Sequence, residues 1–81
     1  MNVLNWDELE AEKAYLMHKP NDGETLTCRA YNVSGYKELF VQVEGYRDEH
    51  KAAHFRDNVF MEIEMPSRSD WALAILRKDS A

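Results

Sequence analysis

Apolar and polar side chains alternate most regularly between Glu24 and Tyr46, in the two segments ETLTCRAYNV and YKELFVQVEGY. This period of two is typical of a β-strand with one buried face. One face of the second segment carries apolar side chains: Leu39, Val41 and Val43. The matching face of the first segment carries another apolar set: Leu26, Cys28 and Ala30. The pattern predicts one β-hairpin over residues 24–46.

Two turns compete to join these strands. A type I turn over residues 32–35 would place Arg29 opposite Leu39 and would mix the apolar and polar faces. A loop of even length, either Ser34-Gly35 alone or residues 33–36, keeps the apolar side chains together in these pairs: Ala30 with Leu39, Cys28 with Val41 and Leu26 with Val43. Because a one-residue slip would move a whole apolar set into water, we expect the even loop.

A helix is expected before the hairpin and another at the end of the chain. Asn5, followed three residues later by Glu8, predicts a capped helix from Trp6 to about His18. Its apolar stripe has four members: Trp6, Leu9, Leu16 and Met17. Near the other terminus, Ser67 or Ser69 is suited to cap a helix that contains the segment WALAILRK.

A third strand is expected over residues 58–65. Its alternation places one set of side chains on the core face: Val59, Met61, Ile63 and Met65. The opposite set faces outward: Phe60, Glu62 and Glu64. Residues 46–58 show no strand alternation, and they are consistent with a loop or with a short helix that carries Ala52 and Phe55 on one side.

The sequence therefore predicts an α+β fold in a single domain, residues 1–81. Its three-stranded antiparallel sheet consists of the hairpin 24–46 and the strand 58–65. An N-terminal and a C-terminal helix are expected to pack on one face of this sheet.

The charge balance argues against nucleic acid as a direct partner. The chain has 15 acidic and 10 basic side chains and a formal net charge of −5, whereas phosphate backbones are bound by clustered Lys and Arg. The order of the elements resembles that of double-stranded-RNA-binding domains, but Ser67 to Trp71 lacks the basic start of their last helix. No apolar run is long enough to span a bilayer, so we expect a soluble, cytoplasmic protein without a membrane partner.

Few residues are candidates for chemistry. His50 and His54, four residues apart, would share a helix face as metal ligands do, but no HExxH motif or second cysteine supports a metal site. Cys28 lies on the apolar face and is expected to be a buried thiol. Glu62 and Glu64 lack any sign of a pocket that would tune them for acid–base catalysis. We therefore predict no catalytic residue, no cofactor, no resident metal and no enzymatic activity.

The strongest functional prediction concerns the outer face of the sheet. Aromatic side chains among carboxylates suit a protein-binding surface, and six residues are the candidates: Glu38, Phe40, Glu44, Phe60, Glu62 and Glu64. The expected partner is a protein with a basic surface. Small acidic proteins that bind in this way include phage- or plasmid-encoded inhibitors of nucleic-acid-handling enzymes, and we expect this protein to be such an inhibitor. Two alternatives are a homodimeric accessory or regulatory domain joined through the C-terminal helix, and a metal-binding module built on His50 and His54.

Overall fold

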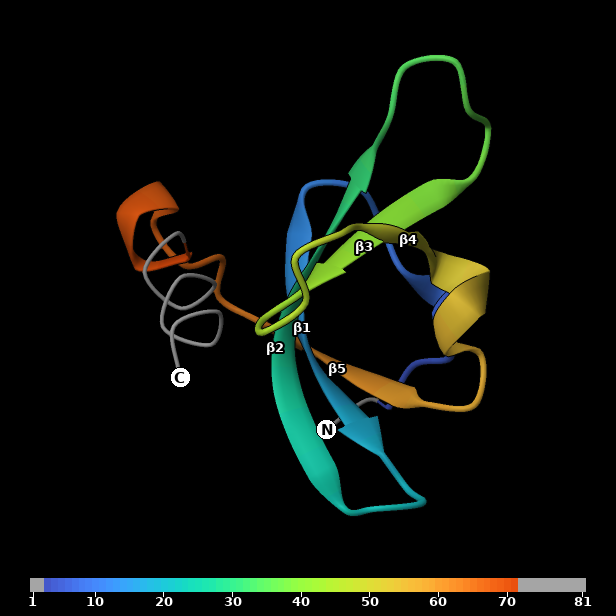
Figure 1. Cartoon of the computed structure of the whole chain (residues 1–81), viewed down its shortest axis with the longest axis vertical. Helices are drawn as coiled ribbons and strands as arrows, with labels where there is room; N and C mark the ends of the chain where they lie inside the picture. The colour runs from blue at the N-terminus through green and yellow to red at the C-terminus, as the bar shows by residue number, and fades with distance from the viewer. Residues whose placement is uncertain (1–2, 72–81) are drawn as a thin grey trace.

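The computed structural model describes residues 3–71, which form a five-stranded antiparallel sheet in the order β4-β3-β2-β1-β5 (Figure 1). The strands are β1 (Lys13–Lys19), β2 (Glu24–Asn32), β3 (Leu39–Val43), β4 (His50–Lys51) and β5 (Val59–Ile63). Two short 3₁₀ helices, η1 (Trp6–Glu8) and η2 (Ala52–Phe55), complete the named elements. The predicted three-stranded sheet with two helices packed on one face is therefore wrong.

The largest error concerns the expected helix from Trp6 to His18. Only η1 is helical, and the Glu8 carboxylate accepts the backbone N–H of Asn5 at 2.8 Å there. The chain then turns through Glu12, whose φ is +64°, and enters β1. This strand pairs with both β2 and β5. Tyr15 and Met17 are buried on one face of β1, and on the other face Ala14 is buried and Leu16 half-buried, so the strand lacks the alternation that identifies a strand with one solvated face.

The hairpin of β2 and β3 has the predicted faces but a different register. The structure pairs Cys28 with Val43 and Ala30 with Val41, so the predicted contact of Cys28 with Val41 is wrong by two residues. Residues 33–38 form the connecting loop, which contains a turn closed by the Tyr36 N–H and the Val33 carbonyl. Burial fixes which face a strand presents, but a shift of two residues leaves every face unchanged. The apolar pattern therefore could not select the register.

The two faces of strand β5 are the reverse of the predicted ones. Phe60 pairs with Met17 and is only 1% exposed, so it lies on the core face, whereas Met61 lies beside Leu16 on the outer face. The core cluster comprises the following side chains: Tyr15, Met17, Leu26, Cys28, Ala30, Val41, Val43, Ala52, Phe55 and Phe60. The Tyr15 and Phe60 rings pack edge to face, with their centroids 6.3 Å apart.

Different segments cover the two faces of the sheet. The helices η1 and η2 are in contact with each other, and hydrophobic residues around them pack against the core cluster. At the left of Figure 1, across the sheet from η2, a helical turn begins at residue 68, and the Ser67 hydroxyl accepts the N–H of Asp70 at 3.1 Å, as the predicted cap requires. Trp71 follows and is 6% exposed. The rest of the predicted last helix lies outside the described residues.

Cys28 is fully buried, and burial raises the pKa of its thiol to about 12. In an unfolded chain the thiol ionises near 9. The free energy of unfolding should therefore fall as the pH rises from about 9 to about 12, because only the unfolded state loses its proton there. Denaturation at about pH 8 and about pH 11 measures this fall, which should be smaller in Cys28→Ala. Equal falls in both proteins would contradict it.

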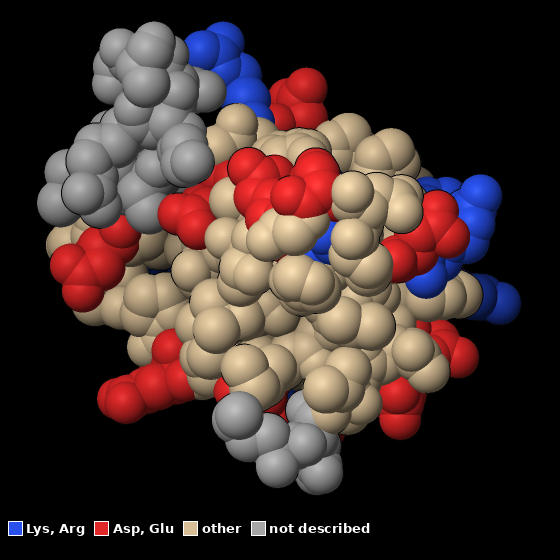
Figure 2. Space-filling view, turned by 90° about the horizontal axis from the view of Figure 1, so that it is seen from below, with Lys and Arg blue, Asp and Glu red and all other residues tan. Residues whose placement is uncertain are grey.

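One face of the molecule carries side chains of both charges (Figure 2). Figure 2 shows acidic groups at several points around one face, with Lys and Arg side chains gathered near its right and upper edges. This view agrees with the excess of 15 acidic over 10 basic residues in the whole chain. No described helix is both long enough and apolar enough to cross a bilayer.

Candidate functional site

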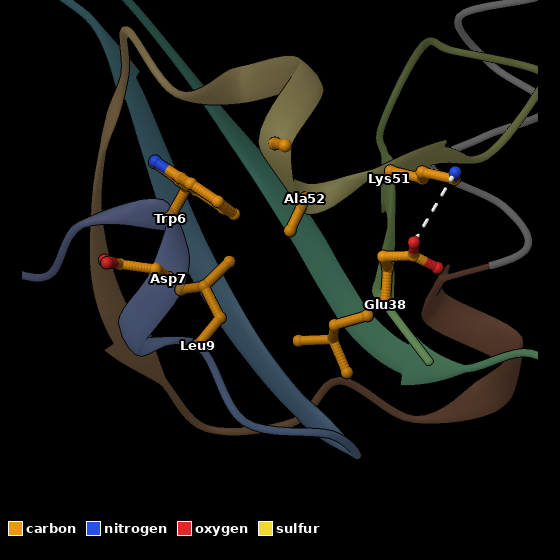
Figure 3. A pocket seen from close by; sticks show the side chains of 8 residues that line it. Trp6, Asp7, Leu9, Glu38, Lys51 and Ala52 are labelled. Carbon is orange, nitrogen blue, oxygen red and sulfur yellow. Dashed lines mark ion pairs between the residues drawn. The ribbon is translucent and has the colours of Figure 1, made fainter. Parts of the chain in front are cut away.

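A cavity of about 290 Å³ lies beside η1 and η2, next to the start of β3 and the edge strand β4 (Figure 3). Within residues 3–71, eight side chains line it: Trp6, Asp7, Leu9, Glu38, Leu39, Lys51, Ala52 and Ala53. We call this cavity the η1–η2 cleft. Its residues come from three separate parts of the chain, which the sheet topology brings together.

The walls of the cleft are apolar. In Figure 3, Trp6 and Leu9 extend from η1 and its end toward Ala52 at the start of η2. Trp6 and Leu9 are half-buried, so part of each side chain remains open to a ligand. The position of η1 is fixed by the chain before it, because Leu4 exchanges two backbone hydrogen bonds with Phe60, at 2.7 and 2.9 Å. The tryptophan wall is therefore tied to β5, the last strand of the sheet.

The charged groups lie at one side of the cleft. The Lys51 ammonium is 3.8 Å from a Glu38 carboxylate oxygen, and both side chains are about half exposed. The same ammonium lies 5.7 Å from the centroid of the Tyr36 ring. Asp7 points away from the hollow in Figure 3. Because exposed ion pairs contribute only about 0–1 kcal/mol, Glu38 and Lys51 form a weakly held pair that a ligand can open.

Aromatic rings hold η2 in place behind the cleft. Phe55 is buried, and edge-to-face contacts join its ring to Tyr46, His50 and His54. Of the two structures considered for residues 46–58, a loop or a short helix with Ala52 and Phe55 on one side, the structure has as its only helix there the four-residue 3₁₀ helix η2, in which both residues are buried. This packing anchors η2, which forms the wall of the cleft on the β4 side, to the core through Phe55.

His50 and His54 stack on each other, with their ring centroids 4.4 Å apart and their planes 14° from parallel. The lone pairs of imidazole nitrogens lie in the ring plane, and nearly parallel planes do not meet close to the rings. One metal ion bound to both would therefore require one ring to rotate. Among the described residues, no group of three or more His, Cys, Asp or Glu side chains is placed to hold a metal.

The six predicted site residues do not form one surface. Glu38 lines the cleft, whereas Phe40 and Glu44 belong to the outer face. Phe60 is in the core, so its prediction as an exposed anchor is wrong. Glu62 lies on the core side of β5 at its end and pairs with Lys13 at 3.4 Å. Glu64 is exposed beyond the end of β5.

Part of the predicted aromatic surface is nevertheless present. Phe40 pairs with Tyr31 across the two strands, and its ring centroid is 5.1 Å from that of Tyr36. The Tyr31 hydroxyl donates to the Glu49 carboxylate, and burial raises the pKa of Tyr31. Glu44 is already engaged, because its carboxylate accepts the Thr27 N–H at 2.9 Å. Phe40 and Tyr36 lie next to the cleft, because Lys51, which lines it, pairs with Phe40 across the strands and lies near the Tyr36 ring.

Sequence reasoning missed most of the cleft. It assigned Trp6 and Leu9 to the buried stripe of a long helix, and it gave no role to Lys51 or Ala53. The weak helix signal at Ala52 and Phe55 was the one available sign of η2. Nothing in the sequence pattern indicated that η1 and η2 meet, because their contact depends on the order of strands in the sheet.

A second, smaller hollow of about 160 Å³ lies on the outer face beside β1 and β5. Its lining is mostly apolar: Val3, Leu16, His18, Thr25, Val59, Phe60 and Met61. None of the described residues that line it is Asp, Glu, Lys or Arg, so it offers less than the cleft to orient a ligand.

Comparison of the chain with protein-family models, with curated proteins and with solved structures gave no match. The geometry and charge of the cleft are therefore the basis for a functional proposal.

Proposed function

We propose that the protein is a non-enzymatic binding module that docks on a basic surface of another protein through the η1–η2 cleft. The observation that carries this proposal is the cleft itself, an open apolar cavity of about 290 Å³ bordered by a half-buried tryptophan and an exposed ion pair. Protein interfaces concentrate their binding energy in anchoring side chains that fill such pockets. Its size is near the lower limit for small-molecule sites and suits a single side chain.

The charge of the chain supports a basic partner. A net charge of −5 attracts a positive surface over distances longer than direct contact and speeds the encounter. Three carboxylates near the tryptophan wall are exposed: Asp7, Glu8 and Glu10. Association with the partner should therefore slow as salt is added, because salt largely screens exposed charges that are farther apart than the Debye length, about 8 Å at physiological ionic strength.

The narrower prediction, that the partner is a nucleic-acid-handling enzyme inhibited by a phage- or plasmid-encoded protein, stays a prediction. So does the metal-binding alternative. The homodimer alternative concerns residues that mostly lie outside the described part of the chain. The first residue of the predicted dimer helix segment, Trp71, is buried. Its indole N–H donates to the Gln42 side chain at 3.2 Å, so this ring faces the chain's own sheet.

A matched pair of variants tests the cleft once a partner has been captured from the source cells. Ala53→Leu adds bulk to the cleft, and Thr25→Leu adds bulk to the outer-face hollow. We expect Ala53→Leu to weaken the complex at least about tenfold, as loss of an anchoring pocket does, and Thr25→Leu to leave the affinity unchanged. Calorimetry measures both, and the opposite ranking would contradict the proposal.

A further inference from the structure

We infer that the η1–η2 cleft recognises an arginine side chain of the partner, which lies with its stem against Trp6 and Leu9 and its guanidinium at Glu38. This inference rests on the proposed function and names the residue that the cleft receives. It follows from the separation of apolar and charged groups across the cavity (Figure 3).

The two ends of the cleft have different chemistry. Trp6 and Leu9 form an apolar wall at one side, and the Glu38 carboxylate lies at the other. A purely aliphatic ligand would cover the wall but leave the carboxylate without a new partner. A long side chain with an apolar stem and a cationic end matches both, because such residues bury their methylene groups while the charged end stays near water.

The ion pair between Glu38 and Lys51 is suited to exchange. At 3.8 Å it is longer than a good charge-assisted hydrogen bond. In the same position, the Lys51 ammonium also lies 5.7 Å from the centroid of the Tyr36 ring, and cation–π contacts of this kind stabilise an ammonium. When a ligand cation binds Glu38, Lys51 retains a partner. The exchange therefore costs little.

Arginine fits better than lysine. Its planar guanidinium can bind both oxygens of a carboxylate and is more weakly hydrated than an ammonium, so it loses less on entering a half-open cavity. Lys51 is the one cation among the described residues that line the cleft, and of the two acidic lining residues Glu38 lies at the hollow while Asp7 points away from it. The net charge of −5 favours a cationic ligand over an anionic one.

Capped tripeptides test the inference without the natural partner. Acetyl-Gly-Xaa-Gly-amide peptides, in which Xaa is Arg, Lys, Leu or Glu, are titrated into the ¹⁵N-labelled full chain. The readout is the shift of the Trp6 indole and of the Ala52 and Ala53 amides. We expect the Arg peptide to bind most tightly, and Glu38→Gln to weaken it about tenfold, the range of a lost charge-assisted contact.

The two halves of the ion pair should give opposite effects. Lys51→Met keeps the apolar stem but frees Glu38, so it should tighten binding of the Arg peptide, by up to about fivefold if the pair is worth up to 1 kcal/mol. A preference for the Leu peptide that ignores both variants would overturn the arginine inference and leave the cleft as an anchor site. A preference for the Glu peptide, with both signs reversed, would overturn it in the same way. No response of the cleft residues to any peptide would contradict the proposed function as well.

Discussion

Replacing Phe60 by alanine should lower the free energy of unfolding by about 3–5 kcal/mol, the usual loss for a large aromatic residue in a core. Phe60 is 1% exposed and packs edge to face on Tyr15. It also lies between β1 and the Leu4 segment, so the cavity left by its ring would be enclosed on both sides. A chain of this length has a total stability of roughly 4–12 kcal/mol, and the variant should therefore be largely unfolded when warmed. Urea denaturation measures the loss.

Phe40→Ala is the matched control. Phe40 is half-buried on the outer face, where its ring contacts Tyr36 near the sheet edge. Since part of its area is already in water, the loss should be at most about half of that for Phe60. Equal losses would show that Phe60 is not enclosed in the core as the structure has it.

Replacing Trp71 by alanine should cost about 3–5 kcal/mol as well. Trp71 is 6% exposed, and its indole N–H donates to the Gln42 side chain on the outer face of β3. Removing the ring would expose the outer face where the segment after β5 crosses it. Thermal and urea unfolding of the purified variant give the magnitude.

Two controls separate the indole hydrogen bond from the burial of the ring. Trp71→Phe keeps most of the apolar area and should lose only about 1 kcal/mol, the value of one hydrogen bond. Trp6→Ala removes a half-buried ring at the cleft, so it should affect ligand binding more than stability. If Trp6→Ala lowers the free energy of unfolding more than Trp71→Ala does, Trp71 is not buried against the outer face of the sheet as the structure has it.

Much of the central hairpin was predictable because burial constrains it directly. The apolar face of β2 and β3 is the predicted one, with Cys28, Val41 and Val43 fully buried. The caps at Asn5 and Ser67 were also found from local sequence, since each depends on residues three positions apart. These features involve neighbours along the chain or a strict period of two.

The missed features depend on long-range packing. The segment from Lys13 to Lys19 contributed Leu16 and Met17 to the apolar stripe of the predicted helix, but in the structure it is a strand that pairs with β2 on one side and β5 on the other. In β5, three apolar residues on one face outweighed Phe60 on the other. The structure buries Phe60 because it pairs with Met17, a partner that the sequence pattern had placed in a helix.

The candidate site could be predicted only in part, because it too depends on long-range packing. Glu38 was predicted and lines the cleft, whereas Trp6 and Lys51 were not predicted to contribute. Carboxylates and aromatic residues can be read from a sequence, but their arrangement depends on which strands are neighbours. An error in one strand moved Phe60 and Glu62 from the outer face to the core side.

Amide hydrogen exchange of the protein, free and bound to its partner, tests the role of the cleft most directly. Binding there should slow exchange in η1 and across Lys51 to Phe55, because a ligand in the cleft restrains both walls. The amides around Leu16 and Met61, beside the outer-face hollow, should exchange as they do in the free protein. Protection confined to Leu16 and Met61, with η1 and η2 unchanged, would place the binding surface on the opposite face and contradict the proposal.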